Sequence, residues 1–182
     1  MLAIAHRLRA ERIPADVIWL DIDYQLKYRP FTIDRTRFPH FEQMIHTLKA
    51  EELRTVAITD LHIADLPHAG YKPYDEGAAK GYFVRNPDGS NYVGEVWPGK
   101  SVFPDFTRGA VRDWWGSLDA DFVHNGVAGF WNNMNEPAIF DVASKTMPDD
   151  VKHRIEEPGF EPRVATSGDS QHLRDAKQPR DF

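Results

Sequence analysis

The sequence has 182 residues, of which 41% are hydrophobic and 12% aromatic, a composition typical of one globular domain with its own core. Its net charge of −6 argues against nucleic acid as a partner, because phosphate binding requires a basic surface. The absence of cysteine excludes disulfides and thiol chemistry, and it is compatible with the cytoplasm without requiring it. No run of eighteen apolar residues occurs, so we expect no membrane-spanning helix.

The first third of the chain predicts two helices that alternate with two strands. Ile4 and Leu8 lie one helical turn apart, which predicts a short opening helix. Residues 16–23, DVIWLDID, contain a nearly continuous apolar run, typical of a strand covered on both faces. A helix is predicted after Pro39, and residues 55–61, TVAITDL, predict a second buried strand. The apolar stripe of the helix consists of Phe41, Met44, Ile45 and Leu48.

The remaining sequence predicts a long loop, one helix, one strand and a polar tail. Residues 62–106 show no strong periodicity, and a loop of that length is usually functional. Thr107 is the predicted N-cap of a helix, and a third strand starts at Gly126. Repeated strand–helix units predict an α/β fold with a parallel sheet. From Ser167 the chain has too few apolar residues to offset the entropy of ordering, so we expect disorder there.

All three predicted strands end in polar residues, and ligands of parallel α/β folds bind at the carboxyl ends of strands. Asp21 and Asp23 end the first strand, Asp60 ends the second, and residues 132–136 follow the third. Carboxylates beside aromatic side chains suit a sugar, because the acids accept hydrogen bonds from hydroxyls and indole faces cover the apolar side of the ring. The nearby aromatic residues are Trp19, Tyr24, Trp97 and Trp131.

A structural interpretation of the same residues stays open. An aspartate at a strand end often caps the next helix or forms a turn. The two tryptophans of the predicted helix, Trp114 and Trp115, are expected in the core rather than at a site. His62 and His68 do not have the spacing of a metal site, and we expect neither a metal nor a cofactor.

Four segments together resemble glycoside hydrolase family 31, which is best known for α-glucosidases. They are IPADVIWLDIDY (13–24), KPYDEG (72–77), VWPGKSVFPDFT (96–107) and GFWNNMNEP (129–137). The resemblance covers residues 1–166 and implies part of a (β/α)8 barrel, about strands two to four with their helices. It also implies hydrolysis with retention of configuration through a covalent glycosyl-enzyme, with an α-linked oligosaccharide or glucoside as substrate.

The resemblance assigns roles to individual residues. In the family signature W-x-D-M-N-E the aspartate is the nucleophile, and Asn133 stands at that position, between Trp131 and Met134 of the same motif. Asp21 matches the residue that holds hydroxyls of the non-reducing sugar, and Asp60 ends a strand near the pocket. The pocket wall is assigned to Ile22, Ile63, Trp97, Trp131 and Met134.

The sequence departs from the family pattern in three ways. Asn133 is an amide, which keeps the shape of aspartate but is a poor nucleophile and carries no charge. The family's acid/base aspartate lies on a later strand, beyond the 182 residues of this chain. Residues 167–182 do not resemble the family, and we expect a shifted reading frame or a chimeric end there. The family's preceding β-sandwich and first barrel strand are also expected to be absent.

Three functional hypotheses follow. In the first, the chain is a fragment of a retaining α-glucosidase-type hydrolase. The fragment is inactive in isolation, and its parent protein supplies the rest of the barrel. A variant of this hypothesis is a family member of other specificity, such as an α-xylosidase. In the second, the chain is a non-catalytic carbohydrate-binding remnant. In the third, it is a truncated product without independent function, because open strand edges and uncovered apolar faces favour association.

Overall fold

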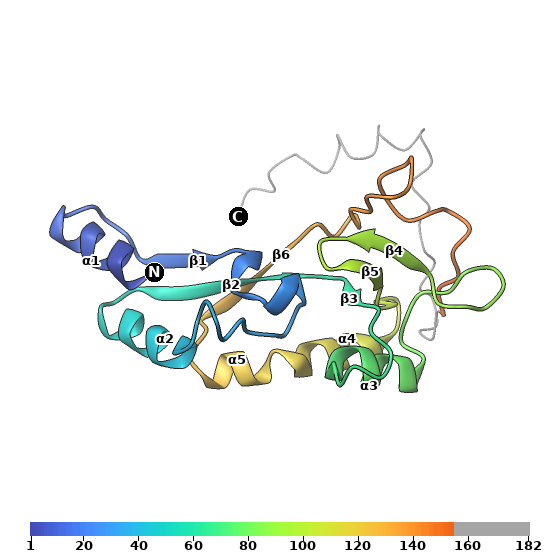
Figure 1. The fold of residues 1–182 in the computed structure, drawn as a ribbon, viewed down its shortest axis with the longest axis horizontal. Coiled ribbons are helices and arrows are strands. Elements are labelled where there is room, and N and C mark those ends of the chain that lie inside the picture. The colour runs from blue at the N-terminus through green and yellow to red at the C-terminus, as the bar shows by residue number, and fades with distance from the viewer. Residues whose placement is uncertain (155–182) are drawn as a thin grey trace, which may run out of the picture.

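The computed structural model describes residues 1–154. The predicted polar tail, residues 167–182, lies outside the described residues. Within them the chain forms two sheets, one parallel and one antiparallel, with helices packed beneath (Figure 1). No helix in residues 1–154 has the length and apolar character needed to cross a membrane.

The parallel sheet consists of β1 (Val17–Leu20), β2 (Arg54–Asp60) and β6 (Gly129–Asn133), in the spatial order β1-β2-β6. The apolar runs predict all three strands, and their parallel pairing confirms the predicted α/β class. Because the strands run in one direction, their carboxyl ends meet at one edge, where the predicted polar residues lie.

In Figure 1, α2 (Phe41–Ala50) and α5 (Ala120–His124) lie on one face of this sheet, α1 (Leu2–Ala10) lies beside the start of β1, and α3 (Lys72–Lys80) and α4 (Gly109–Leu118) lie beneath the antiparallel sheet. The opposite face of the parallel sheet carries no helix among the described residues. The predicted first and second helices are confirmed as α1 and α2. The predicted third helix is two helices, α4 and α5. Two single-turn 3-10 helices, η1 (Ile22–Tyr24) and η2 (Leu26–Tyr28), follow β1.

The predicted N-cap of the third helix was wrong. Arg108 occupies the N-cap of α4, and no side chain caps its amides. The hydroxyl of Thr107 donates instead to Oδ1 of Asp105 at 2.7 Å. The amide of Thr107 donates to the same oxygen at 3.3 Å, so Asp105 holds Thr107 in a turn that precedes the helix.

The prediction that residues 62–106 form an irregular loop was also wrong. They contain β3 (Ile63–Ala64), α3 (Lys72–Lys80), β4 (Val93–Val96) and β5 (Gly99–Val102). The strands form an antiparallel sheet in the order β3-β5-β4. Strands of two to four residues are too short to show an alternating pattern in sequence.

The core is divided into clusters that follow the two sheets. The first cluster fills the space between the parallel sheet and its helices and includes Leu20, Phe41, Ile45 and Ala57. The second lies between the antiparallel sheet, α3 and α4, where Trp114 is buried and Trp115 is partly buried, as expected for core tryptophans. A third cluster attaches the chain that follows β6 to the antiparallel sheet, through Ile139.

Candidate active site at the strand ends

The register of the parallel sheet places several predicted site residues on its uncovered face. Trp19 is the partner of Val56, Trp131 of Ile58, and Asn133 of Asp60. Opposed residues of parallel strands project from the same face, and side chains two apart along a strand share that face. Six residues therefore share the face opposite the helices: Trp19, Asp21, Ile58, Asp60, Trp131 and Asn133.

Two tryptophans form the apolar floor of this face. The rings of Trp19 and Trp131 meet edge to face, with centroids 6.0 Å apart. Trp19 is 57% exposed, whereas its chain neighbours Ile18 and Leu20 are buried against the helices. Nε1 of Trp131 donates to the carbonyl of Leu20 at 3.4 Å. The indole surfaces are thus held in place and remain open to a ligand.

The three strand-end aspartates have different environments. Asp21 is exposed, and its Oδ1 accepts a hydrogen bond from the amide of Ile22 at 2.7 Å as the N-cap of η1. The structural role considered for this residue is therefore realised, although a second oxygen remains for a ligand. Asp23 forms an exposed ion pair with Arg37 at 2.7 Å. Asp60 is 1% exposed, and burial, followed by the charge of Asp21, raises its pKa to about 6.

Asn133 ends β6, and the chain turns immediately after it. Asn133 and Met134 are both partly buried. Met134 has a left-handed backbone conformation, with φ of 53°, which is uncommon outside glycine. This turn directs residues 135–147 away from the parallel sheet and onto the antiparallel sheet, where the amide of Phe140 donates to the carbonyl of Glu95 at 2.8 Å.

Trp97 lies in the turn between β4 and β5 of the antiparallel sheet. Its ring stacks on the buried ring of His62 at 6.3 Å and meets the ring of Phe140 edge to face at 4.8 Å. Burial lowers the pKa of His62 to about 4, so the imidazole is neutral at pH 7 and acts as an apolar support. Phe140, 45% exposed, was not predicted as a site residue, because a lone phenylalanine in a loop carries no pattern.

The two predicted isoleucines lie in cores. Ile22 is partly buried against the first cluster. Ile63 is fully buried in the second cluster, so its side chain presents no surface to a ligand in this structure. Ile58, which was not predicted, shares the side of β2 that carries Asp60 by strand alternation, but it is 2% exposed and also presents no surface to a ligand. Among residues 1–154 no group of three metal-binding side chains is gathered.

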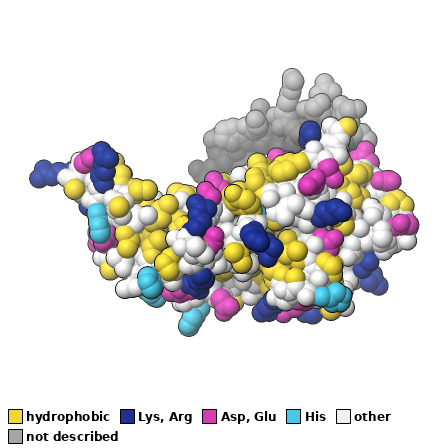
Figure 2. Space-filling view, viewed as in Figure 1, with side chains coloured by type: hydrophobic (Ala, Val, Ile, Leu, Met, Phe, Trp, Pro, Cys, Tyr) yellow, Lys and Arg dark blue, Asp and Glu magenta, His cyan; other side chains and the backbone are white. Residues whose placement is uncertain are grey.

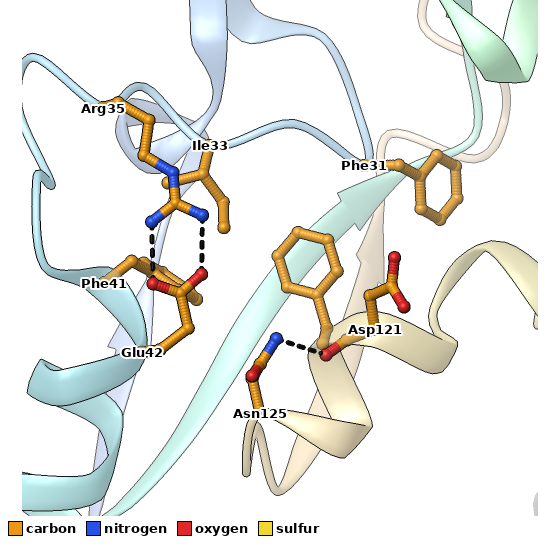
Figure 3. Close-up of a pocket in the computed structure, with 8 residues that line it drawn as sticks. Phe31, Ile33, Arg35, Phe41, Glu42, Asp121 and Asn125 are labelled. Carbon is orange, nitrogen blue, oxygen red and sulfur yellow. Dashed lines mark hydrogen bonds and ion pairs between the residues drawn. The ribbon is translucent and has the colours of Figure 1, made fainter.

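A cavity of about 300 Å³ lies between α2, α5 and the loop that follows η2, away from the strand ends (Figure 3). The side chains of Arg35, Glu42 and Asn125 in its lining are already paired. Arg35 donates two hydrogen bonds to Glu42, at 2.6 and 2.7 Å, and Asn125 donates to the carbonyl of Asp121 at 2.8 Å. The bond from Arg35 lowers the pKa of Glu42 to about 2, so both groups are ionised and bind each other. The cavity therefore adds nothing to the site.

The strand-end site combines exposed indole surface with carboxylates that can accept hydrogen bonds from hydroxyl groups. At position 133 it offers an amide, which can bind a hydroxyl but cannot form a glycosyl ester. The arrangement fits recognition of a sugar ring more closely than its cleavage by the described residues alone.

Comparison with known proteins identifies the family of the chain. A family model, the glycosyl hydrolases family 31 TIM-barrel domain, matches residues 1–173. Alpha-glucosidase 2 of Bacillus thermoamyloliquefaciens is 46% identical over 150 residues, which cover 82% of this chain and 19% of that protein. The chain therefore spans about a fifth of the length of this relative.

Solved structures share the fold of the described residues. The glucosidase II alpha subunit in its alpha3-Glc2-bound form matches with a TM-score of 0.76 and 34% identity, over 84% of this chain and 17% of that chain. The family 31 alpha-glucosidase from Bacteroides thetaiotaomicron matches with a TM-score of 0.73 and 40% identity, over 82% of this chain and 25% of that chain. These matches confirm that the parallel sheet and its helices are a portion of a TIM barrel.

Proposed function

This chain belongs to glycoside hydrolase family 31, and we propose that it is the part of a retaining α-glucosidase-type hydrolase that binds the sugar to be released. The proposal rests on one observation above all, the strand register, by which Asp21, Asp60, Trp131 and Asn133 share one face at the strand ends. Asp21, which is exposed, accepts hydrogen bonds from sugar hydroxyls, while Trp131, Trp97 and Met134 cover the apolar side of the ring. Asp60 is buried at the end of β2 and supports the side chain at 133 rather than the sugar.

The residue at position 133 decides whether this site can cleave a glycosidic bond. Retaining hydrolysis needs two carboxyl groups about 5–5.5 Å apart, one as nucleophile and one as acid/base. Asn133 cannot serve as the nucleophile, and the resemblance puts the acid/base residue outside this chain. We therefore expect the isolated chain to be inactive and the α-glucosidase activity to require both a carboxylate at 133 and the remainder of the barrel.

A graft tests this proposal. The 150 matching residues of this chain replace their counterparts in Alpha-glucosidase 2 of Bacillus thermoamyloliquefaciens, which restores the rest of the barrel. The graft with Asn133 should leave an α-glucoside uncleaved, and Asn133→Asp should restore turnover. Asn132→Asp, on the opposite face of the same strand, is the matched control and should stay inactive. A folded graft that carries Asn133→Asp and binds sugar without cleaving it contradicts the proposal.

Sugar specificity is part of the proposal. The names of the relatives favour α-glucosides over α-xylosides, since the three proteins described above are called alpha-glucosidases or glucosidase II. Turnover of paired aryl α-glucoside and α-xyloside substrates by the Asn133→Asp graft would decide between them.

A second function, sugar binding without hydrolysis, is favoured by Asn133 itself. The amide keeps the size of aspartate and leaves the indole surface of Trp19 and Trp131 open. Calorimetry of the isolated chain with maltose, isomaltose and xylose-containing sugars tests it. Saturable binding that Trp131→Ala abolishes supports this function, and no heat with any of them contradicts it.

We also propose that residues 1–166 form the barrel portion and that residues 167–182 are a separate polar tail. Removal of the tail should leave the thermal unfolding of the chain unchanged. A clear fall in melting temperature after removal would place part of the tail in the fold.

A further inference from the structure

Asp60 and Asn133 are cross-strand partners at the ends of β2 and β6. Directly opposed side chains of parallel strands project from the same face, and the strands lie about 4.8 Å apart. Asp60 is 1% exposed, and its Oδ1 atom has no hydrogen-bond partner within residues 1–154. Residue 133 thus lies beside a buried carboxyl group whose hydrogen bonding is incomplete.

The charges around Asp60 are negative or absent. Asp21, at the end of β1, acts on it as a like charge, and the phenol of Tyr24 in η1 lies within its field. From β6, the partner is the uncharged Asn133. No lysine, arginine or histidine within the described residues forms an ion pair with Asp60. Burial and the charge of Asp21 together make a second negative charge beside it costly.

We propose that Asp60 is the positioning residue for the side chain at 133 and restricts the two side chains together to one negative charge. With asparagine at 133, the two groups together carry at most one negative charge. With aspartate at 133, the two carboxyl groups share one proton near neutral pH, because adjacent carboxylates cannot both ionise without a large penalty.

This pairing gives Asn133 a physical role in the present chain. The amide removes the like charge that an aspartate would bring, so Asp60 can stay buried. It also sets a condition for catalysis, which rests on the proposed function: an aspartate at 133 acts as the nucleophile only while Asp60 holds the shared proton. The pairing itself is measurable in a chain that has no activity, so its failure is separate from failure of the proposed function.

The experiment is thermal unfolding of the full 182-residue chain at pH 4.5 and pH 8. The variants are Asn133→Asp, Asp60→Asn, the double variant, and Asn132→Asp as matched control, since Asn132 is the exposed neighbour on the opposite face. At pH 8, Asn133→Asp should lower the melting temperature by roughly 3 °C or more, and Asn132→Asp by much less. The loss should shrink at pH 4.5 and in the Asp60→Asn background.

A second measurement covers a variant that fails to fold at pH 8. If Asn133→Asp is unfolded there, circular dichroism should show it folded at pH 4.5, or at pH 8 once Asp60→Asn is added. Equal losses for Asn133→Asp and Asn132→Asp overturn the proposal. It is also overturned if the loss caused by Asn133→Asp is the same with and without the Asp60 carboxyl, or if neither acid nor Asp60→Asn restores the fold.

Discussion

The Nδ1 atom of His153 lies 2.9 Å from Oδ1 of Asp105, 48 residues earlier in the chain. The same carboxyl group accepts a hydrogen bond from the amide of Arg154 at 2.6 Å and from the hydroxyl of Thr107 at 2.7 Å. These bonds fasten the last described residues beside the antiparallel sheet. The buried carboxylate, together with the backbone bridge between Arg85 and Lys152, therefore holds residues 152–154 beside the antiparallel sheet.

We predict that Asp105→Asn destabilises the protein at pH 7. Burial acts to raise the pKa of Asp105, but the bonds from His153, Thr107 and Arg154 outweigh it and hold the pKa at about 2. The bonds to a buried charge should be worth roughly 1.5–3 kcal/mol in the free energy of unfolding. Urea unfolding monitored by circular dichroism measures the loss.

The pH dependence of this loss follows from the lowered pKa. An unfolded aspartate has a pKa of about 3.9, so the stabilisation is complete above that pH and is lost as the pH falls through about 2. The Asp105→Asn variant should lack this part of the acid dependence. The exposed Asp150 gives the control, and Asp150→Asn should leave stability unchanged. If both variants have the same free energy of unfolding at each pH, the carboxylate of Asp105 does not stabilise the fold.

Asp119 should behave in the opposite way. Its Oδ1 is buried without a hydrogen-bond partner among the described residues, and burial raises its pKa to about 6. Protonation is therefore favoured in the folded state, so stability is fully present below about pH 3.9 and falls as the pH rises through 6. We predict that Asp119→Asn raises the melting temperature at pH 8 by about 2–4 °C and has little effect at pH 4.

The exposed Asp113 on α4 is the control for Asp119. Asp113→Asn should not change the melting temperature at either pH. A pH-independent effect of Asp119→Asn would mean that the change acts through packing rather than ionisation.

The edge strands and the uncovered face of the parallel sheet should make copies of the isolated chain associate with one another. β1 and β6 are edge strands within residues 1–154, and Trp19 lies exposed on the face without helices. Hydrophobic side chains are also visible near α1 (Figure 2). We predict that Trp19→Lys shifts the chain toward monomer in sedimentation velocity, because a charge on an edge strand opposes pairing. Val93→Lys should not, because the outer side of β4 is already covered by the chain at Phe140, whose amide donates to the carbonyl of Glu95. An unchanged distribution for Trp19→Lys would exclude the β1 edge.

The parallel sheet and the antiparallel sheet differ in how well the sequence predicts them. Buried parallel strands appear as apolar runs, and the polar residues that end each run can be assigned to one edge of the sheet from the sequence alone. The strand-end prediction for Asp60 requires only the run TVAITDL and the rule that parallel strands end together. That Asp21 also caps η1 depends on the turn after β1, which no periodicity describes.

Contacts between distant segments could not be predicted. The stacking of Trp97 on His62, and the edge contact with Phe140, bring together the residue before β3, the turn after β4 and the chain after β6. None of these residues lies in a periodic pattern, and each is placed by the antiparallel sheet that the sequence failed to indicate. The resemblance suggests Trp97, but only tertiary packing explains what supports it.

Two helical glycines have different surroundings, since Gly77 is closely packed and Gly116 has open space beside it. A Cβ atom at Gly77 of α3 would meet Cε1 of Phe83 at 2.7 Å and Cη2 of Trp114 at 3.1 Å. A Cβ atom at Gly116 of α4 would meet nothing within 4 Å. Alanine is favoured over glycine inside a helix by roughly 0.5–1 kcal/mol. This backbone effect is the same for Gly77→Ala and Gly116→Ala, so the two substitutions differ only in packing.

We predict that Gly116→Ala stabilises the protein by about 0.5–1 kcal/mol. Gly77→Ala should destabilise it, because overpacking a core costs roughly 1–3 kcal/mol and exceeds the backbone gain. Urea unfolding of both variants measures the two signs. Two stabilising substitutions would mean that Phe83 and Trp114 can move aside, and that α3 is packed less tightly against α4 than the second cluster implies.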